Sequence, residues 1–312
     1  MTAMNRREAL RLLAGASVMP FAAHAAEGDL RRGTLIVEAM RTRRIPSSGE
    51  PLPVIGLGTW QTFDVDASPA SRAPLKEVLQ TFAGMGGRVI DSSPMYGAAE
   101  EVVGDLAHEL GLADKLFLAT KVWTSVRQAG VEQMEASMRK LRTERIDLMQ
   151  VHNLLDVETH LATLREWKAA GKVRYVGITH YTAGAHDEMT RLVEKHPLDF
   201  IQINYSVAER EAERRLLPLA RERGVAVIVN RPFGGGGLFS RLRGKPVPKW
   251  AVDLDCESWA QLMLKFVISH PAVTCAIPAT SKVEHVRDNM SAGRGRLPDA
   301  KQREAIVQAV GG

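Results

Sequence analysis

Residues 161–178, LATLREWKAAGKVRYVGI, contain the unit from which the fold is built. Apolar residues recur at helical spacing from residue 161 to residue 170, and Gly171 is the residue type that commonly ends a helix. An apolar, β-branched run follows at residues 173–178, which is typical of a buried strand. A helix, a glycine stop and a strand in this order predict one repeat of an α/β fold.

The same alternation of strand and helix continues along most of the chain. Short apolar runs predict eight strands, at residues 54–57, 88–91, 116–120, 146–151, 173–178, 200–203, 226–229 and 274–277. Helical spacing predicts the intervening helices, at residues 75–85, 100–110, 131–141, 161–170, 186–195, 214–223 and 259–268. Eight strands that are each followed by a helix imply parallel pairing with right-handed crossovers, and eight is the number that closes a barrel.

An open, doubly wound sheet is the main alternative to a barrel. Such a sheet usually carries a Gly-x-Gly-x-x-Gly turn after its first strand, but residues 56–60 read GLGTW and lack the third glycine. We therefore expect an α/β fold of the (β/α)8 TIM-barrel type over residues 49–312, preceded by an N-terminal extension at residues 26–48. A β-hairpin over residues 35–44 is a further expectation.

The composition is close to that of an average globular protein. Of the 312 residues, 45% are hydrophobic and 25% are charged, which excludes a disordered chain or a fibre. The net charge of +5 is spread along the chain, whereas a DNA-binding protein gathers its basic residues into a stripe, so we expect no nucleic-acid partner. Cys256 and Cys275 both fall in core-like segments, which favours free buried thiols over a single bridge.

The first 25 residues have the three parts of an export signal. Arg6 and Arg7 lie in a basic region, an apolar run too short to span a bilayer follows at residues 12–23, and small residues at positions 23 and 25 resemble a cleavage site. Paired arginines before such a run resemble a twin-arginine signal, for which the partner is the twin-arginine translocase. The alternative is a cytosolic helix that begins with two arginines. We expect a periplasmic or otherwise exported protein, with no stable membrane insertion after signal cleavage.

Polar residues follow the predicted strands at their carboxyl ends, where a barrel of this kind builds its active site. They are Asp91, Tyr96, Lys121, Trp123, His152, Asn153, Thr179, His180, Gln202, Asn204, Asn230 and Arg231. A single buried histidine or a helix-capping aspartate would need no functional explanation. The convergence of Asp, Lys, His and Tyr side chains on one rim instead favours a catalytic site.

Four of these residues have the properties of an acid–base site. A tyrosine starts with a pKa near 10, and a neighbouring ammonium favours the phenolate and so lowers that pKa. We expect Lys121 to act on Tyr96 in this way, while Asp91 keeps the lysine charged and in place. His152 would then orient an oxygen atom of the substrate.

The loops after the last two strands predict an anion site. Residues 231–238 read RPFGGGGL, and residues 278–283 read PATSKV. Successive glycines let backbone N–H groups approach an anion closely. Thr280, Ser281 and Lys282 precede a helix N-terminus, which itself attracts anions. A plain flexible loop would explain the glycines alone, but the two loops together favour a phosphorylated cofactor.

Stretches in a fixed order along the chain resemble motifs of the aldo-keto reductase superfamily. They read GLGTW (56–60), VIDSSPMYG (89–97), ATKVW (119–123), RIDLMQVH (145–152), GKVRYVGIT (171–179) and QINY (202–205), followed by a related stretch at 277–289. The resemblance covers the chain from about residue 50 onward. It implies a barrel that binds NADP(H) without a Rossmann domain, and a catalytic tetrad of Asp91, Tyr96, Lys121 and His152.

The implied reaction is hydride transfer between a nicotinamide and a carbonyl, in which Tyr96 protonates the oxygen and His152 holds it. The resemblance assigns to the cofactor Gly58, Thr59, Thr179, His180, Gln202, Asn230, Arg231, Pro232, Gly234, Thr280, Ser281, Lys282, His285, Asp288 and Asn289. It places Trp60, Trp123 and Asn153 beside the substrate. His180 replaces a more usual Asn, Asn230 a stacked Tyr, and His285 an Arg at the 2′-phosphate. NADP(H) is favoured, and NAD(H) is the alternative.

We interpret the chain as an exported NAD(P)H-dependent enzyme that interconverts an aldehyde or ketone and its alcohol. One alternative is an exported nicotinamide-binding sensor or binding subunit with little turnover, which would have no need of a tyrosine beside a lysine. Another is a barrel isomerase or hydrolase, which the missing carboxylate pair disfavours. No metal site is predicted, since His180 and His186 lack a third ligand at metal-binding spacing.

Overall fold

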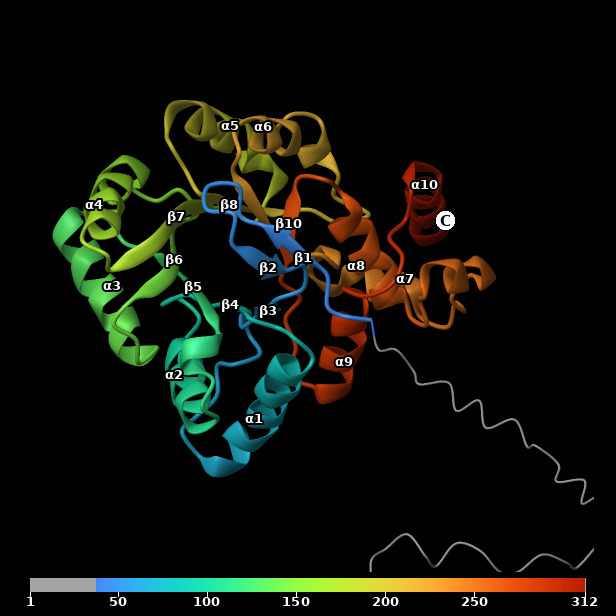
Figure 1. Cartoon of the computed structure of the whole chain (residues 1–312), viewed down its shortest axis with the longest axis horizontal. Coiled ribbons are helices and arrows are strands. Elements are labelled where there is room, and N and C mark those ends of the chain that lie inside the picture. The colour runs from blue at the N-terminus through green and yellow to red at the C-terminus, as the bar shows by residue number, and fades with distance from the viewer. Residues whose placement is uncertain (1–37, 312) are drawn as a thin grey trace, which may run out of the picture. The chain divides into compact units, whose positions relative to one another are not determined.

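The protein is represented by a computed structural model that describes residues 38–311, and the predicted export signal at residues 1–25 lies outside this range. Eight strands form one sheet in chain order. They are β3 (Leu57–Gly58), β4 (Val89–Asp91), β5 (Phe117–Val122), β6 (Ile146–His152), β7 (Val173–Thr179), β8 (Phe200–Asn204), β9 (Ala226–Asn230) and β10 (Val273–Ala276). All neighbours pair in parallel. Bridges from Ile55 to Ala276 and from Gly58 to Ala279 close the sheet, which confirms the predicted barrel (Figure 1).

Helices surround the barrel (Figure 1). They are α1 (Pro69–Gly84), α2 (Ala99–Glu109), α3 (Arg127–Lys140), α4 (Val157–Ala169), α5 (His186–Lys195), α6 (Leu216–Glu222), α7 (Gly237–Leu242), α8 (Trp259–Ser269), α9 (Val283–Ser291) and α10 (Ala300–Gly311). The glycine stop predicted at Gly171 is confirmed, and Gly86, Gly111, Gly171 and Gly224 follow α1, α2, α4 and α6 with φ angles of 93°, 62°, 75° and 65°. These left-handed angles are ones that glycine adopts without a steric penalty.

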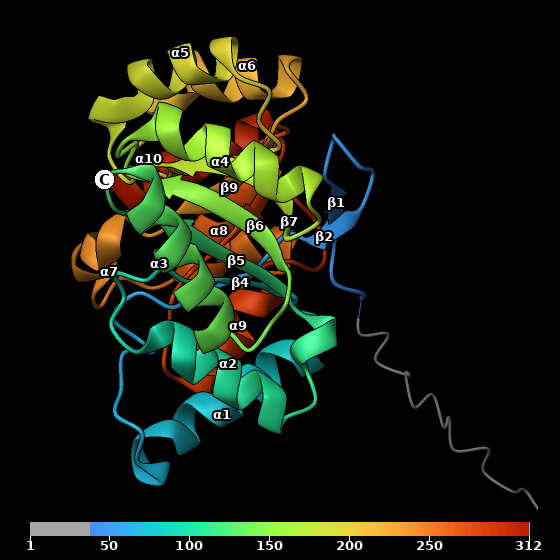
Figure 2. The ribbon, with the colours of Figure 1, turned by 90° about the vertical axis from the view of Figure 1, so that its left-hand side faces the viewer.

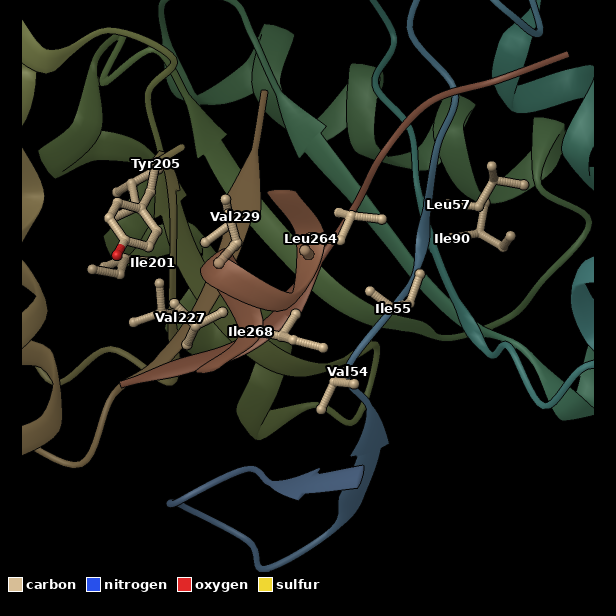
Figure 3. Close-up of a cluster of buried hydrophobic side chains, with 14 of the residues drawn as sticks. Val54, Ile55, Leu57, Ile90, Ile201, Tyr205, Val227, Val229, Leu264 and Ile268 are labelled. Atoms are coloured by element: carbon tan, nitrogen blue, oxygen red, sulfur yellow. The ribbon is translucent and has the colours of Figure 1, made fainter. Parts of the chain in front are cut away.

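Alternation along each strand divides the buried side chains into two sets. On β9, Ala226 and Ile228 belong to the cluster inside the barrel, whereas Val227 and Val229 belong to the larger cluster beneath the helices. Figure 3 shows the two valines beside α8. Because successive side chains of a strand point to opposite faces, the residues that follow the inner set at the strand ends are directed toward the barrel mouth.

A β-hairpin precedes the barrel, but the predicted position at residues 35–44 is wrong. β1 (Thr42–Arg44) pairs antiparallel with β2 (Pro51–Pro53), so the hairpin crosses the expected boundary at residue 48. Its strands are basic and proline-rich, which hid them in the sequence. They are held in place because Ile45 and Leu52 are fully buried in the cluster inside the barrel. Figure 2 shows the hairpin at one end of the barrel and α7 at the other.

Cys256 and Cys275 are free, buried thiols, as the sequence predicted. Burial raises the pKa of the Cys256 thiol to about 11, so it stays protonated and unreactive near neutral pH. Between residues 38 and 311, none of the helices is both long enough and apolar enough to span a lipid bilayer.

Candidate active site

The centre of the site is a buried ion pair at the carboxyl ends of β4 and β5. Lys121 is fully buried, and Asp91 is 2% exposed. The Lys121 ammonium donates to Asp91 Oδ2 and to the Ser92 backbone oxygen, each at 2.6 Å. Burial by itself lowers the pKa of Lys121, but the Asp91 carboxylate and the Tyr96 oxygen raise it above its ordinary value. Lys121 is therefore a positive charge held inside the protein.

Two glutamines hold the other oxygen of the Asp91 carboxylate. Gln202 Nε2 donates to Asp91 Oδ1 at 2.7 Å, and Gln150 Nε2 lies 3.4 Å from the same atom. The sequence predicted Gln202 as a cofactor ligand but missed Gln150. The sequence does contain a signal for Gln150. It lies two residues before His152 on β6, so the two side chains share one face of the strand. The carboxylate is thus surrounded by donors and cannot rotate freely.

Tyr96 lies beside the ammonium of this pair. Lys121 Nζ is 5.0 Å from the centre of the Tyr96 ring. Burial raises the pKa of Tyr96 above its ordinary value, and the Lys121 charge opposes that rise without cancelling it. The expectation of a lowered tyrosine pKa is wrong, because desolvation of the phenolate outweighs attraction by the ammonium. Tyr96 therefore holds its proton at neutral pH.

His152, at the end of β6, is 5% exposed and has two aromatic rings as neighbours. The Tyr96 ring is edge-on to it at 5.9 Å between centroids, and the Trp123 ring lies at 6.4 Å. Burial, with the Lys121 charge and His180 as smaller causes, lowers the pKa of His152 to about 2. The ring is consequently neutral and offers one N–H donor. Ser93, which the sequence did not single out, contacts its Nδ1 atom at 3.1 Å.

The ends of β7, β8 and β9 form a polar network next to these groups. Gln202 Oε1 accepts from Thr179 Oγ1 at 3.1 Å and from Asn230 Nδ2 at 3.4 Å. Asn230 Nδ2 also donates to the His180 backbone oxygen at 3.2 Å. The His180 ring stacks on that of Tyr181, with centroids 5.4 Å apart. Within the described part of the chain, the buried atom Asn230 Oδ1 has no hydrogen-bond partner.

The glycine-rich loop begins directly after β9. Gly234, Gly235 and Gly236 all have positive φ, at 58°, 67° and 91°. The φ angle of Gly235 is one that L side chains rarely adopt, so this position favours glycine. Arg231 Nε is buried and has no partner among residues 38–311. Pro232 joins this arginine to the loop.

The loop after β10 brings together only part of the predicted phosphate site. Thr280 Oγ1 lies 3.3 Å from His285 Nδ1 and accepts the Lys282 backbone N–H at 3.1 Å. The side chain of Asp288, by contrast, accepts from Ser258 Oγ at 2.8 Å and from Gln261 Nε2 at 2.7 Å, and so joins α9 to α8. The predicted phosphate-site residues that lie in this loop or on α9 near these Thr280 contacts are Thr280, Ser281, Lys282, His285 and Asn289.

Residues near the start of the barrel have divided roles. The side chain of Thr59 is fully buried and donates to the Asp91 backbone oxygen at 2.9 Å. Gly58 lies against the Ile277 carbonyl, where a Cβ would approach to 2.9 Å. Gly58 therefore supports the closure of the barrel, whereas Thr59 joins the start of the barrel to β4. Trp60 and Trp123, by contrast, are 48% and 40% exposed. They share the open end with other exposed apolar side chains, namely Met95, Tyr181 and Phe239.

Asn153 follows His152 in a left-handed backbone conformation, with φ of 52°. Its Oδ1 atom is buried and has no partner in the range 38–311. The predicted substrate-lining residues thus combine two exposed tryptophans with one unpaired amide oxygen. Taken together, the fold and the site define a (β/α)8-barrel enzyme with an acid–base centre at the carboxyl end of its strands.

Comparisons with known proteins identify the family. The sequence profile of the Aldo/keto reductase family matches residues 54–309, and the chain belongs to this family of oxidoreductases. It is similar to methylglyoxal reductase YeaE of Escherichia coli (strain K12), with 31% identity over 273 residues, which are 84% of this chain and 93% of that protein.

Two solved structures of aldo/keto reductases from Klebsiella pneumoniae are also similar. One, in complex with NADP and acetate, has a TM-score of 0.72 and 26% identity, and the match covers 84% of this chain and 93% of that one. The other, in complex with NADPH, has the same TM-score and identity, with coverage of 88% and 96%.

Proposed function

We propose that the protein is an NADPH-dependent carbonyl reductase in which Tyr96 is the proton donor. One observation carries the proposal: the buried Lys121–Asp91 pair lies beside a protonated tyrosine and an electrically neutral histidine. Such a set can protonate and hold an oxygen atom, and it contains no evident nucleophile. The similar proteins, which include a methylglyoxal reductase and structures with NADP or NADPH, support this reading.

The residues at the ends of β7 to β10 fit a phosphorylated nicotinamide cofactor. Asn230 Oδ1 is a buried acceptor without a donor, and Arg231 Nε is a buried donor without an acceptor. A carboxamide and a phosphate are complementary to these two atoms. The residues that would hold the cofactor are Thr179, His180, Gln202, Asn230, Arg231, Pro232, Gly234, Thr280, Ser281, Lys282, His285 and Asn289. Gly58 and Thr59 are buried and would act indirectly, by fixing the start of the barrel. Asp288 would act indirectly, by fixing α9.

When bound, NADPH supplies the hydride. The protein's own groups manage the carbonyl oxygen and its proton. His152 donates its N–H to the oxygen and orients the carbonyl. Tyr96 then gives its proton to the oxygen as negative charge develops there. Lys121 stabilises the phenolate that remains, and Asp91 keeps the ammonium in position. In alcohol oxidation the same groups act in reverse.

Tyr96→Phe tests this assignment, because it removes the hydroxyl and keeps the ring that packs against His152. We expect NADPH to bind normally in a fluorescence titration. Reduction of methylglyoxal should fall at least about 10²- to 10⁴-fold, the usual contribution of general acid catalysis. Tyr181→Phe is the matched control, since Tyr181 is 49% exposed and stands outside the four-residue centre. Near-normal turnover by Tyr96→Phe would show that Tyr96 is not the proton donor.

We propose further that the protein is exported through the twin-arginine route, already folded and loaded with cofactor. The support is the sequence pattern at residues 1–25, in which Arg6 and Arg7 precede a short apolar run. A route for unfolded chains would deliver an empty barrel. A route for folded proteins lets the barrel bind NADP(H) first, and binding stabilises it by about 2.7 kcal/mol at a hundredfold excess over the dissociation constant.

The export proposal predicts that Arg6→Lys/Arg7→Lys retains active protein in the cytosol. Cell fractionation and mass spectrometry under mild conditions measure both parts, because the first locates the protein and the second detects bound nucleotide. Wild-type protein should leave the cytosol with cofactor bound. Exported protein that is folded, empty and able to bind cofactor later would refute the coupling between export and loading.

A further inference from the structure

Ser93 lies directly behind His152, in the turn that follows β4. It is fully buried, and its Oγ atom is 3.1 Å from His152 Nδ1. The other ring nitrogen, Nε2, is the one that a substrate oxygen would meet if His152 orients the carbonyl. Which of the two nitrogens carries the proton therefore decides whether His152 can donate to that oxygen.

The hydrogen-bond partners of Ser93 Oγ determine which nitrogen of His152 carries the proton. The Met95 backbone N–H can only donate, and it donates to Ser93 Oγ at 3.3 Å. The serine hydroxyl has one proton of its own. Among residues 38–311, the contacts of Ser93 Oγ are Met95 N and His152 Nδ1. A serine oxygen can accept two hydrogen bonds, so an Nδ1–H group could donate to it as well, but the buried hydroxyl proton would then have no acceptor among these contacts. Because an unpaired buried donor is costly, the favoured arrangement has the hydroxyl donating to Nδ1 and the ring proton on Nε2.

We propose that Ser93 is a positioning residue that locks His152 in the Nε2–H tautomer, so that the imidazole presents a hydrogen-bond donor to the carbonyl oxygen. The choice of tautomer exists only for a neutral ring. His152 meets that condition, since burial lowers its pKa to about 2. The Lys121 ammonium nearby acts in the same direction, because a positive charge disfavours protonation of the ring.

His180 provides an internal comparison. Its Nδ1 atom accepts the Thr182 backbone N–H at 3.2 Å, and the Thr182 hydroxyl lies at the same distance. The backbone donor alone is enough to fix this ring as Nε2–H, and no side-chain substitution removes it. Thr182→Ala is therefore a matched control for Ser93→Ala, because each deletes one hydroxyl next to the Nδ1 atom of an imidazole.

The primary experiment is NMR of the full chain labelled with ¹⁵N-histidine, with His152 assigned by comparison with His152→Gln. Wild-type His152 should give a pyridine-like Nδ1 and a pyrrole-like Nε2 signal. Ser93→Ala should move both signals toward an average of the two tautomers, and Thr182→Ala should leave them unchanged. A protonated Nδ1 in wild-type protein would overturn the proposal without any Ser93 variant, as would unchanged His152 signals in Ser93→Ala.

The kinetic arm rests on the proposed function. With methylglyoxal and NADPH, kcat/KM of Ser93→Ala should fall about 2- to 13-fold, which corresponds to one neutral hydrogen bond of about 0.5–1.5 kcal/mol. NADPH affinity should be unchanged, and Ser93→Thr should restore both the rate and the NMR pattern. Loss of NADPH affinity, or no rescue by threonine, would assign Ser93 a packing role instead. If wild-type protein reduces no carbonyl, the proposed function fails, while the NMR result still decides the tautomer.

Discussion

Replacing Lys121 by methionine tests the ion pair at the centre of the site. The two side chains are 0% and 3% exposed, and their charged atoms are 2.6 Å apart. At an effective dielectric constant of about 20, unit charges at this separation attract by about 6 kcal/mol. Desolvation of each ion costs several kcal/mol, so the pair as a whole contributes little net stability. Methionine, however, would leave Asp91 as an uncompensated buried charge, and we expect Lys121→Met to lower the free energy of unfolding by about 3–5 kcal/mol.

A double-mutant cycle separates the two contributions. Asp91→Asn keeps an acceptor for one neighbour but removes the charge, and Asp91→Asn/Lys121→Met removes both charges. Because the second substitution relieves the charge stranded by the first, the double variant should be more stable than the sum of the single losses by about 1–3 kcal/mol. Urea unfolding of the four proteins, followed by circular dichroism, gives the required free energies. Additive losses, or a loss below about 1 kcal/mol for Lys121→Met, would refute the reasoning.

Two further outcomes follow from the electrostatics of the site. In the folded protein His152 has a pKa of about 2, whereas a histidine in the unfolded chain has a pKa near 6.5. Between these two pH values only the unfolded chain binds the proton. The free energy of unfolding therefore falls as the pH falls. We expect His152 to account for a loss of about 2 kcal/mol in the free energy of unfolding between pH 7 and pH 5. Urea unfolding of wild-type protein and of His152→Gln at both pH values measures this loss. An equal loss in the variant would contradict the expectation. Lys282→Ala should weaken NADPH binding about 10- to 150-fold and leave NADH binding unchanged, which fluorescence titration checks; equal weakening of both would mean that Lys282 does not contact the 2′-phosphate.

The barrel was predictable because its evidence is local and repeated. Each unit carries a helical period, a glycine stop and a short apolar run, and the bounds predicted for α5, residues 186–195, agree with the structure to the residue. α7 begins in a run of glycines, which disfavour helix, and only Ile306 and Val310 of α10 are buried. The formation of α7 and α10 depends on packing against the folded barrel, and the spacing of apolar residues along the sequence does not reveal such packing.

The site was predictable where strand alternation determines it and not where tertiary contacts do. Asp91, Lys121 and His152 end neighbouring strands, so their convergence follows from parallel pairing alone. The raised pKa of Tyr96 could not be predicted, because burial is its main cause and the extent of burial depends on the folded structure. The engagement of Asp288 with α8 likewise depends on how two helices meet.

The protonation states of the four groups at the centre of the site determine its net charge. Asp91 and Lys121 carry opposite charges, and Tyr96 and His152 are both neutral, so the set has no net charge before reaction. A neutral carbonyl therefore gains little from it in the ground state. In the mechanism that we propose, Tyr96 and His152 are the two neutral donors to the carbonyl oxygen as negative charge develops on it, and the fixed Lys121 ammonium lies beside the Tyr96 ring. Under this proposal the donors are held in place before the reaction, so the site would favour the transition state over the bound substrate, which is the condition for catalysis rather than mere binding.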